Sequence, residues 1–439
     1  MRLRSVTSTI ADVVRMNHSF VTDSMTRAAL RRAIGRRPGS PPGGAAQAEL
    51  DAAEPSVKAY LGLSSGSLAL AGIRVSESGD RYLNVVIGEI TATSLFAGVH
   101  TALTVASQLA ARLGLPLRVI MLDWTSPGNS AATAAALIHS SLTLEGVEVV
   151  EREHVRAVPF TSSDVWLATH SKTAHAVQVA AIAGLIPVDR VVYLIQDYEP
   201  GFSAWSTDSV TAAATYHAGF LPLVNSVPLW EYLTQVEGLA IDRGLVFGPS
   251  LDADALRAAA AARMVQHDRR ILFYARPGKA RNLFHLGIAS LRVAARELAE
   301  AGERVEFLSI GEPHDDVQLA DGAVLHSVGR LGWREYFDFI ATVDVLLSLQ
   351  QSPHPSHPPF DVAISGGYAV TNDFDGRRRS MHPRIVTAPA TPGGLGSALV
   401  GALDLAATDD HGYQPLADAS LGAPLADALE LVAARLLSD

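Results

Sequence analysis

Short apolar, β-branched runs alternate with helical patterns along most of this chain, and no other feature restricts its fold so strongly. The first four runs are residues 83–87, 117–122, 165–168 and 191–195, and a helical pattern covers residues 99–113. Strand–helix alternation of this kind favours parallel sheets that are covered by helices on both faces. The expected fold class is therefore α/β.

The alternation starts again after Phe247-Gly248-Pro249-Ser250, which predicts two successive doubly wound domains. We expect the domains to span residues 81–250 and 251–420. The later strands are expected at residues 270–274, 305–310, 343–349 and 368–371, and helices at 283–299 and 421–439. Ser226 is a candidate side-chain cap for a helix that has Pro228 in its first turn.

Composition removes several classes of function. The 439 residues hold 45 acidic and 35 basic side chains, and the net charge of −10 argues against a nucleic-acid coat. With no cysteine, the chain has no disulfide, zinc-thiolate site, iron–sulfur cluster or cysteine nucleophile. Apolar residues make up 48% of the chain, which is enough for large buried cores.

Residues 1–40 form a basic segment with eight arginines and two aspartates, and the Pro/Gly-rich run 38–44 reads as a linker. Within the arm expected at residues 1–80, a basic amphipathic helix could lie on an anionic membrane surface, or it could pack on the protein body. No apolar run approaches the ~20 residues that a bilayer requires, and no signal-peptide core follows the first methionine. We therefore expect a cytoplasmic protein, with the arm as a candidate for peripheral attachment to the inner face of the membrane.

Two loops are suited to binding anions: one leads into an expected helix, and the other follows an expected strand. Gly98 opens the helix at 99–113, where backbone N–H groups favour negative charge, although a packing glycine fits equally well. After the strand 270–274, Arg276, Lys279 and Arg281 place three cations in six residues just before Asn282. Such a turn can cradle a diphosphate, and the alternative is a solvated basic turn.

A third loop, residues 348–361, is dense in proline, serine and histidine and leads to Ser365-Gly366. Asp361 could accept hydrogen bonds from ribose hydroxyls. His354 and His357 lack the third ligand of a convincing metal site, so no metal is expected.

The fourth loop has the sequence Gln196-Asp197-Tyr198-Glu199-Pro200-Gly201-Phe202 and follows the strand 191–195. Its carboxylates could accept hydrogen bonds from sugar hydroxyls while its aromatic rings cover the apolar face of a sugar. The alternative is an ordinary acidic loop.

Together these loops resemble the GT-B glycosyltransferases of family 4, and among them the WsaF-type rhamnosyltransferases of surface-glycan assembly. The most specific stretches are Y-L-I-Q-D-Y-E-P-G-F, F-Y-A-R-P-G-K-A-R-N and S-P-H-P-S-H-P-P-F-D. The resemblance covers residues 83–375. It implies two Rossmann-like domains that face an interdomain cleft, with a nucleotide sugar as donor and a glycan or lipid-linked glycan as acceptor.

The resemblance also implies roles for single residues. Arg276 and Arg281 would hold the donor diphosphate, and Asp197 and Glu199 would act on the acceptor or sugar side. The remaining donor-binding candidates are Gly98, Gln196, Lys279, Asn282, Gly329, Arg330, Ser352, His354, Asp361, Ser365 and Gly366.

This chain departs from the family pattern at four positions. Arg281 stands where the family has lysine, and Asp361 is a shorter acid than the family glutamate five residues before Gly366. Pro353 replaces a second glutamate, and Gln196 replaces a histidine. The implied activity is transfer of a sugar, best L-rhamnose from dTDP-L-rhamnose, with retention of configuration and without metal or other cofactor. A non-catalytic GT-B scaffold and a GT-B nucleotide-sugar epimerase stay open as alternatives.

Overall fold

The computed structural model describes residues 66–438 except 93, 96–97, 124–127, 143, 145, 264–268, 321, 379–380 and 418–419. The basic segment 1–40 and its linker therefore lie outside the described residues. Two compact units divide the described chain: one runs to Tyr193 and adds Val210–Leu221, and the other comprises Leu194–Ser209 and Pro222–Ser438. Within the described ranges, no helix has the length and apolarity needed to cross a bilayer.

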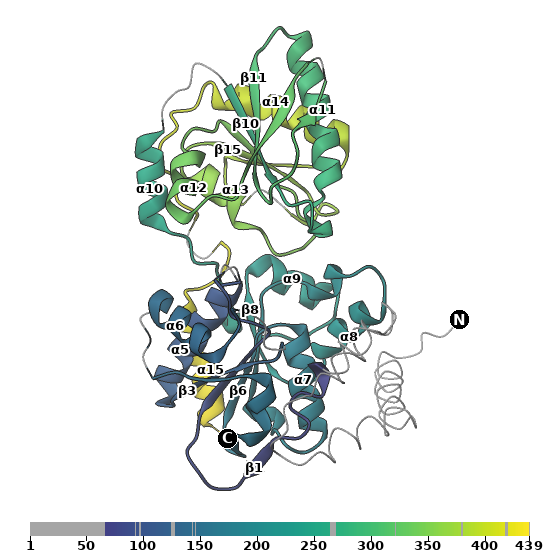
Figure 1. Cartoon of the computed structure of the whole chain (residues 1–439). Coiled ribbons are helices and arrows are strands. Elements are labelled where there is room, and N and C mark those ends of the chain that lie inside the picture. The colour runs from purple at the N-terminus through teal and green to yellow at the C-terminus, as the bar shows by residue number, and fades with distance from the viewer. Residues whose placement is uncertain are drawn as a thin grey trace, which may run out of the picture. The chain divides into compact units, whose positions relative to one another are not determined.

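The first large sheet has seven strands in the order β4-β3-β2-β6-β7-β8-β9. These are β2 (Leu83–Ile87), β3 (Leu117–Met121), β4 (Glu148–Val150), β6 (Val165–Ala168), β7 (Val191–Ile195), β8 (Leu221–Asn225) and β9 (Val246–Phe247). Three of them, β3, β6 and β8, are labelled in Figure 1. Every residue of β2, β3, β6 and β7 is buried. Strands covered on both faces need a nearly continuous apolar run, which is why these segments were recognisable in the sequence despite the buried Asn84 in β2 and Arg118 in β3.

The helices that follow these strands are α5 (Gly98–Leu113), α6 (Ala131–Leu142), α7 (Ser171–Ile182), α8 (Thr207–Thr215) and α9 (Val227–Gln235). A small separate sheet pairs β1 (Arg74–Ser76) with β5 (Pro159–Thr161). At the other end of the chain, α15 (Leu425–Leu437) packs against β9 and the short helix η4 (Arg243–Leu245). A bridge between Phe247 and Ala423 also joins the chain before α15 to β9.

The second large sheet has the order β12-β13-β11-β10-β14-β15-β16, and only β12 runs antiparallel to its neighbour. Its strands are β10 (Arg269–Ala275), β11 (Val305–Gly311), β12 (Val317–Gln318), β13 (Val324–Gly329), β14 (Val345–Leu347), β15 (Tyr368–Asn372) and β16 (Ile385–Ala388). Its helices are α10 (Ala253–Ala262), α11 (Phe284–Glu300), α12 (Trp333–Ile340), α13 (His357–Ile364) and α14 (Pro392–Ala406).

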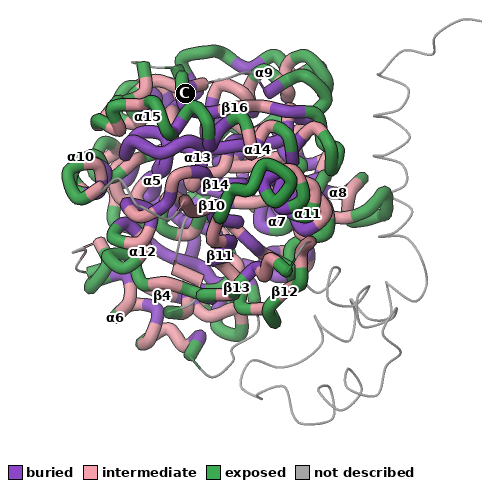
Figure 2. Tube along the Cα trace, turned by 90° about the horizontal axis from the view of Figure 1, so that it is seen from above, coloured by how far each residue is buried: buried purple, intermediate pink, exposed green. Residues whose placement is uncertain are grey.

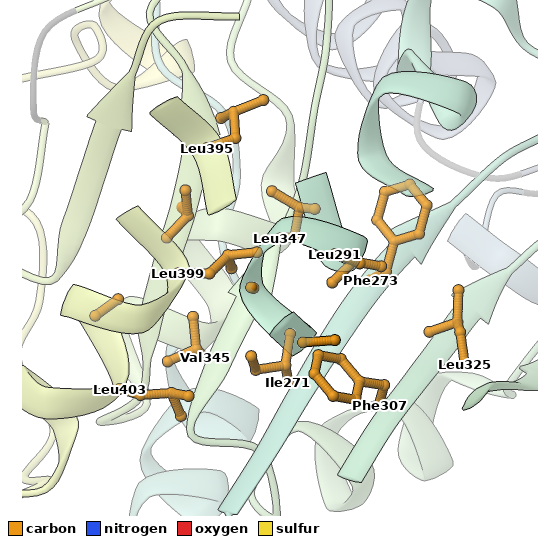
Figure 3. Packing of buried hydrophobic residues seen from close by; sticks show 14 of the residues in the cluster. Ile271, Phe273, Leu291, Phe307, Leu325, Val345, Leu347, Leu395, Leu399 and Leu403 are labelled. Carbon is orange, nitrogen blue, oxygen red and sulfur yellow. The ribbon is translucent and has the colours of Figure 1, made fainter. Parts of the chain in front are cut away.

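Side chains of β10 alternate between two cores, as a strand covered on both faces requires. Ile271 and Phe273 pack with α11 and α14, as Figure 3 shows, whereas Leu272 packs on the face of α12 and α13. A Cβ at Gly287 of α11 would lie 2.2 Å from the Phe273 ring, so glycine permits this close packing. In α10, Leu256 and Ala259 are buried and the outer side of the helix is exposed (Figure 2).

The expected strands 83–87, 165–168 and 191–195 have the bounds of β2, β6 and β7, and the helix expected at 421–439 is α15, which spans Leu425–Leu437. The Pro-rich stretch 348–361 is a loop only as far as Ser356, because α13 begins at His357. The capping prediction for Ser226 was wrong: this residue precedes α9, but its side chain makes no capping hydrogen bond.

Candidate functional site

The strand order of the second sheet sets the place of the candidate site. From β10 the chain moves outward to β11 and β13, and it then returns to the other side of β10 to form β14, β15 and β16. In doubly wound sheets, ligands bind beyond the carboxyl ends of the strands at this point of reversal. The loops after β10 and β14 both leave the sheet there. They touch, because the Gln351 N–H donates to the Arg281 carbonyl at 2.7 Å.

Arg276 directly follows β10 and faces an acidic residue that the sequence did not single out. Its Nε lies 3.8 Å from Oε1 of Glu312, the residue after β11. The other carboxylate oxygen of Glu312 accepts a hydrogen bond of 2.7 Å from the Gly278 N–H. The turn is closed by the Lys279 N–H, which donates to the Arg276 carbonyl at 3.0 Å, and the Lys279 side chain is exposed. Glu312 therefore both shapes the cationic turn and balances its first guanidinium.

Arg281 belongs to a polar network in the second unit, which also contains residues 194–209. Its Nε lies 3.8 Å from Asp197 Oδ2, and its guanidinium lies 4.1 Å above the Phe202 ring. The Ser352 hydroxyl donates to the other oxygen of Asp197, and the His354 N–H donates to Ser352 Oγ at 3.1 Å. Asp197, Arg281, Ser352 and His354 were each predicted separately, and the structure joins them in this network.

The ring of His354 is held in one tautomer. Its Nδ1 lies 2.9 Å from the Asn225 carbonyl oxygen and 2.9 Å from Ser226 Oγ. A carbonyl only accepts, so Nδ1 carries the proton and Nε2 carries the lone pair. Burial lowers the pKa of His354, although the charge of Asp197 opposes this, and the ring is neutral near pH 7. Ser226 reaches this ring from a strained backbone with φ of 98°, a value that favours glycine.

Asp361 lies within α13, and its side chain faces α12. It is 7% exposed and accepts a hydrogen bond of 2.8 Å from the Tyr336 hydroxyl. Burial raises the pKa of Asp361 to about 7. This carboxyl group is therefore partly protonated at neutral pH.

Ser365 and Gly366 are not brought together with the other candidates. They follow α13 and lead into the start of β15, which is the edge of the sheet opposite to Arg276. The Ser365 hydroxyl donates back to the Asp361 carbonyl at 2.7 Å. A Cβ at Gly366, where φ is 97°, would lie 2.0 Å from the His411 carbonyl oxygen. Both residues have a structural reason for their identity.

The remaining candidates occupy several places. Gly329 ends β13 at the same edge as Arg276, and Arg330 follows it with an exposed side chain. Asn282 is 2% exposed, and its amide donates to the Leu349 carbonyl at 3.2 Å. Gln196 directly follows β7, and the buried Glu199 is the first residue of the short helix η3 (Glu199–Phe202). Gly98 is the exposed first residue of α5.

The first sheet also has a reversal point, between β2 and β6, and sequence reasoning missed the residues there. A Cβ at Gly88, directly after β2, would lie 3.1 Å from Asp123 Oδ2 and 3.4 Å from His170 Nε2. His170 Nδ1 accepts a hydrogen bond from the Lys172 N–H, so its Nε2 carries the proton. The signal was present, because Gly88 immediately follows the expected strand 83–87.

Among the described residues, no group of three His, Asp or Glu side chains is arranged to hold a metal ion. The positive charges of the site are the arginine and lysine side chains of the loops. They suit a negatively charged ligand.

Two family models match the chain. The model of the WsaF C-terminal domain matches residues 269–400, and the model of the WsaF N-terminal domain matches residues 82–226. The chain belongs to the WsaF family. The matched regions contain the whole second sheet and all of the first sheet except β9, and the WsaF resemblance seen in the sequence motifs is confirmed.

A curated relative is the O-antigen biosynthesis protein RfbC of Myxococcus xanthus, which is 31% identical over 306 residues. The alignment covers 69% of this chain and 23% of RfbC, so the chain spans less than a quarter of that relative.

Among solved structures, Anabaena Alr3699/HepE in complex with UDP and glucose has a TM-score of 0.51 at 11% identity, covering 82% of this chain and 100% of that one. The N-terminal domain of Candida albicans trehalose-6-phosphate phosphatase has a TM-score of 0.51 at 10% identity, covering 83% and 94%. The predicted GT-B fold, with its two doubly wound parallel sheets, is confirmed.

Proposed function

We propose that this WsaF-family chain is a glycosyltransferase that moves a sugar from a nucleotide-diphosphate donor to a glycan acceptor. The observation that carries the proposal is the placement of Arg276 and Arg281 on the loop that leaves β10 at the point of strand reversal. Basic side chains there meet the position at which doubly wound sheets bind their ligands. Support also comes from HepE, whose structure holds UDP and glucose, and from RfbC, a protein of O-antigen biosynthesis.

The two guanidinium groups would stabilise the negative charge that builds up on the diphosphate as the sugar departs. Arg276 would exchange its contact with Glu312 for the ligand, and Arg281 would do so from its position beside Asp197. Prearranged cations of this kind act mainly in the transition state, where the leaving charge is greatest. Because the arginines supply positive charge, we propose that the reaction needs no metal ion.

The sugar side of the site would be formed by the residues around Asp197. The neutral His354 ring offers the lone pair of Nε2 to a sugar hydroxyl, and Glu199 offers a carboxylate. Trp205 is fully exposed, so its ring is available to stack on the apolar face of a sugar, whereas the ring of Phe202, which is 43% exposed, already carries the Arg281 guanidinium on one side.

The finer assignments rest on the resemblance of the sequence motifs to WsaF-type rhamnosyltransferases. They are L-rhamnose from dTDP-L-rhamnose as donor, retention of configuration, and an acceptor that belongs to a cell-surface polysaccharide. We propose that transfer takes place in the cytoplasm, with the basic N-terminal segment as a membrane contact when the acceptor is lipid-linked.

A thermal-shift panel of UDP, dTDP and GDP with their sugars tests the proposal. A bound nucleotide at 100 times its Kd should stabilise the folded chain by about 2.7 kcal/mol. Failure of every nucleotide to shift the melting temperature would contradict the proposal. Binding without turnover would favour a non-catalytic scaffold, and a new nucleotide sugar made without acceptor would favour an epimerase.

Arg276→Ala should lower donor turnover by about 10²–10³-fold, the usual cost of losing one charge-stabilising contact. Turnover is measured as release of the nucleoside diphosphate. Arg257→Ala is the matched control, because Arg257 is an exposed arginine of α10 that pairs with Asp254 at 3.2 Å. Equal turnover in the two variants would count against the role of Arg276.

A further inference from the structure

Arg378 is a buried arginine below the loop that follows β14. It is 8% exposed, and one terminal nitrogen donates to Thr371 Oγ1 at 3.0 Å and to the carbonyl and side-chain oxygens of Asn372 at 3.1 and 3.2 Å. The other terminal nitrogen donates to the carbonyls of Gln350 at 3.2 Å and Ser352 at 2.5 Å. All five acceptors are uncharged oxygens. Burial lowers the pKa of Arg378 to about 10, so the group still carries its charge at neutral pH.

A buried arginine without a carboxylate in direct contact is unusual, because burial of a charge is costly unless it is paired. Within the part of the chain that the structure describes, Arg378 forms no ion pair, and its Nε has no hydrogen-bond partner. Asp197 and Asp373 act on it only through their charge. The position therefore has a cost in folding free energy that an ordinary structural contact would not require.

Two routes lead from Arg378 to Arg281. In the first, Arg378 binds the Gln350 carbonyl, and the N–H of the same peptide group, on Gln351, donates to the Arg281 carbonyl at 2.7 Å. In the second, Arg378 binds the Ser352 carbonyl, and the Ser352 hydroxyl donates to Asp197, which faces the Arg281 side chain at 3.8 Å. Chains of hydrogen bonds strengthen one another in a medium of low dielectric. Arg378 thus fixes both the backbone of Arg281 and its counterion.

Neighbouring side chains hold the same loop. Asn372 Oδ1 accepts from the Gln350 N–H at 2.9 Å, and its amide donates to the Gln350 carbonyl at 3.1 Å. Asn282 donates to the Leu349 carbonyl at 3.2 Å. The loop is therefore bound peptide by peptide, and Arg378 supplies the only charged donor to its carbonyls among the described residues.

We propose that Arg378 is a positioning residue for the donor diphosphate: its planar guanidinium holds the loop 350–352, and through this loop it keeps Arg281 in the position that grips the two phosphates. The inference rests on the proposed function, because it assigns Arg378 a part in the same site. Arg378 acts through Arg281 and does not itself touch the ligand.

The test compares Arg378→Met, Arg378→Lys, Arg281→Met and the double variant R281M/R378M. Arg263→Met is the matched control. Arg263 is also largely buried with a pKa lowered to about 10, and it donates to carbonyls, among them Ser365 at 2.8 Å and Ile340 at 3.0 Å, at the opposite edge of the sheet. UDP, dTDP and GDP are first tested on the wild-type chain, and the one that binds is used for all variants. Isothermal titration calorimetry then gives the Kd of this diphosphate and the Kd of the corresponding monophosphate.

In Arg378→Met we expect the Kd of the diphosphate to rise by about tenfold or more, in line with a lost charge-assisted contact, while the Kd of the monophosphate changes by less than about threefold. The double variant should bind the diphosphate no more than about threefold more weakly than Arg281→Met, because both changes remove one shared contact. Arg378→Lys keeps the charge but not the planar fork, and it should lie between wild type and Arg378→Met. Arg263→Met should leave the ratio of the two Kd values unchanged.

An unchanged ratio in Arg378→Met, or effects of Arg281→Met and Arg378→Met that multiply, would overturn the inference and leave the proposed function standing. If the wild-type chain binds none of the three diphosphates, the proposed function fails instead. If Arg378→Met does not fold, Arg378→Lys decides: a ratio of diphosphate Kd to monophosphate Kd equal to that of wild type overturns the inference, and a raised ratio supports it.

Discussion

Asp361 makes the stability of the second sheet depend on pH in an unusual direction, and Asp361→Asn tests this. The carboxyl group is 7% exposed, accepts one hydrogen bond from Tyr336, and has a pKa raised by burial to about 7. In the unfolded chain the pKa of an aspartate is about 3.9. Between these two values the folded state binds a proton that the unfolded state has lost, so the free energy of unfolding falls as the pH rises.

The magnitude follows from the two pKa values. Above pH 7 both states are ionised, and the buried carboxylate costs the folded state about 4 kcal/mol relative to strongly acidic solution. About 2.5 kcal/mol of this loss falls between pH 5 and pH 8. Asparagine has nearly the same shape and stays neutral. The variant should therefore gain about 2.5 kcal/mol of stability over wild type across that pH range.

Urea unfolding of both proteins at pH 5, 6, 7 and 8, followed by intrinsic fluorescence, measures this difference. Burial lowers the pKa of His170 and His357 to about 4, so these two groups lower the free energy of unfolding as the pH falls. Both proteins share this effect, and it cancels in the comparison. Tyr336→Phe removes the donor to Asp361 and should shift the loss of stability to higher pH. A difference between Asp361→Asn and wild type that stays constant from pH 5 to pH 8 would refute the reasoning.

Two further variants test single contacts of the site. Glu312→Gln removes the charge that faces Arg276 at 3.8 Å, and calorimetry should show that a nucleoside diphosphate binds about two- to fivefold more tightly, which is the scale of a partly exposed ion pair. The control Glu306→Gln affects the Arg270 ion pair at the other edge of the sheet and should leave this Kd unchanged. Equal effects of the two variants would contradict the prediction. Gly366→Ala places a Cβ 2.0 Å from the His411 carbonyl oxygen, so urea unfolding should show a loss of at least ~2 kcal/mol while the folded variant keeps its diphosphate Kd. Weaker diphosphate binding with unchanged stability would instead return Gly366 to the donor site.

Much of the fold could be predicted because buried parallel strands and amphipathic helices leave strong patterns. The strands β2 and β7 are buried at every residue, and α15 presents Leu429, Val432 and Leu436 on one buried face. The two prolines after His357 predict a loop at the place where the structure has helix α13. Proline is tolerated in a first helical turn, where the missing N–H has no partner to lose.

The candidate site was predictable only in part. Arg276 and Arg281 stand directly after a recognisable strand, so the position of their loop follows from the sheet itself. Glu312 and Arg378 reach the same loops from other strands, and such contacts depend on the packing of segments that are distant in sequence. Ser226 shows a further limit: its backbone conformation is set by its surroundings, so a residue typical of helix caps binds His354 instead.

The late segment that leads into α15 has a consequence for synthesis on the ribosome. The Leu421 carbonyl accepts from the Val227 N–H at 2.8 Å, and the Ala423 carbonyl accepts from the Gly248 N–H at 2.9 Å. The segment 421–423 is thus the neighbour of β9 on its outer side, and it is translated only after the whole second sheet. Until then an unpaired strand edge is exposed on the nascent chain, and such edges readily recruit foreign strands. Premature termination before Leu421 would thus harm the half of the protein that was made first.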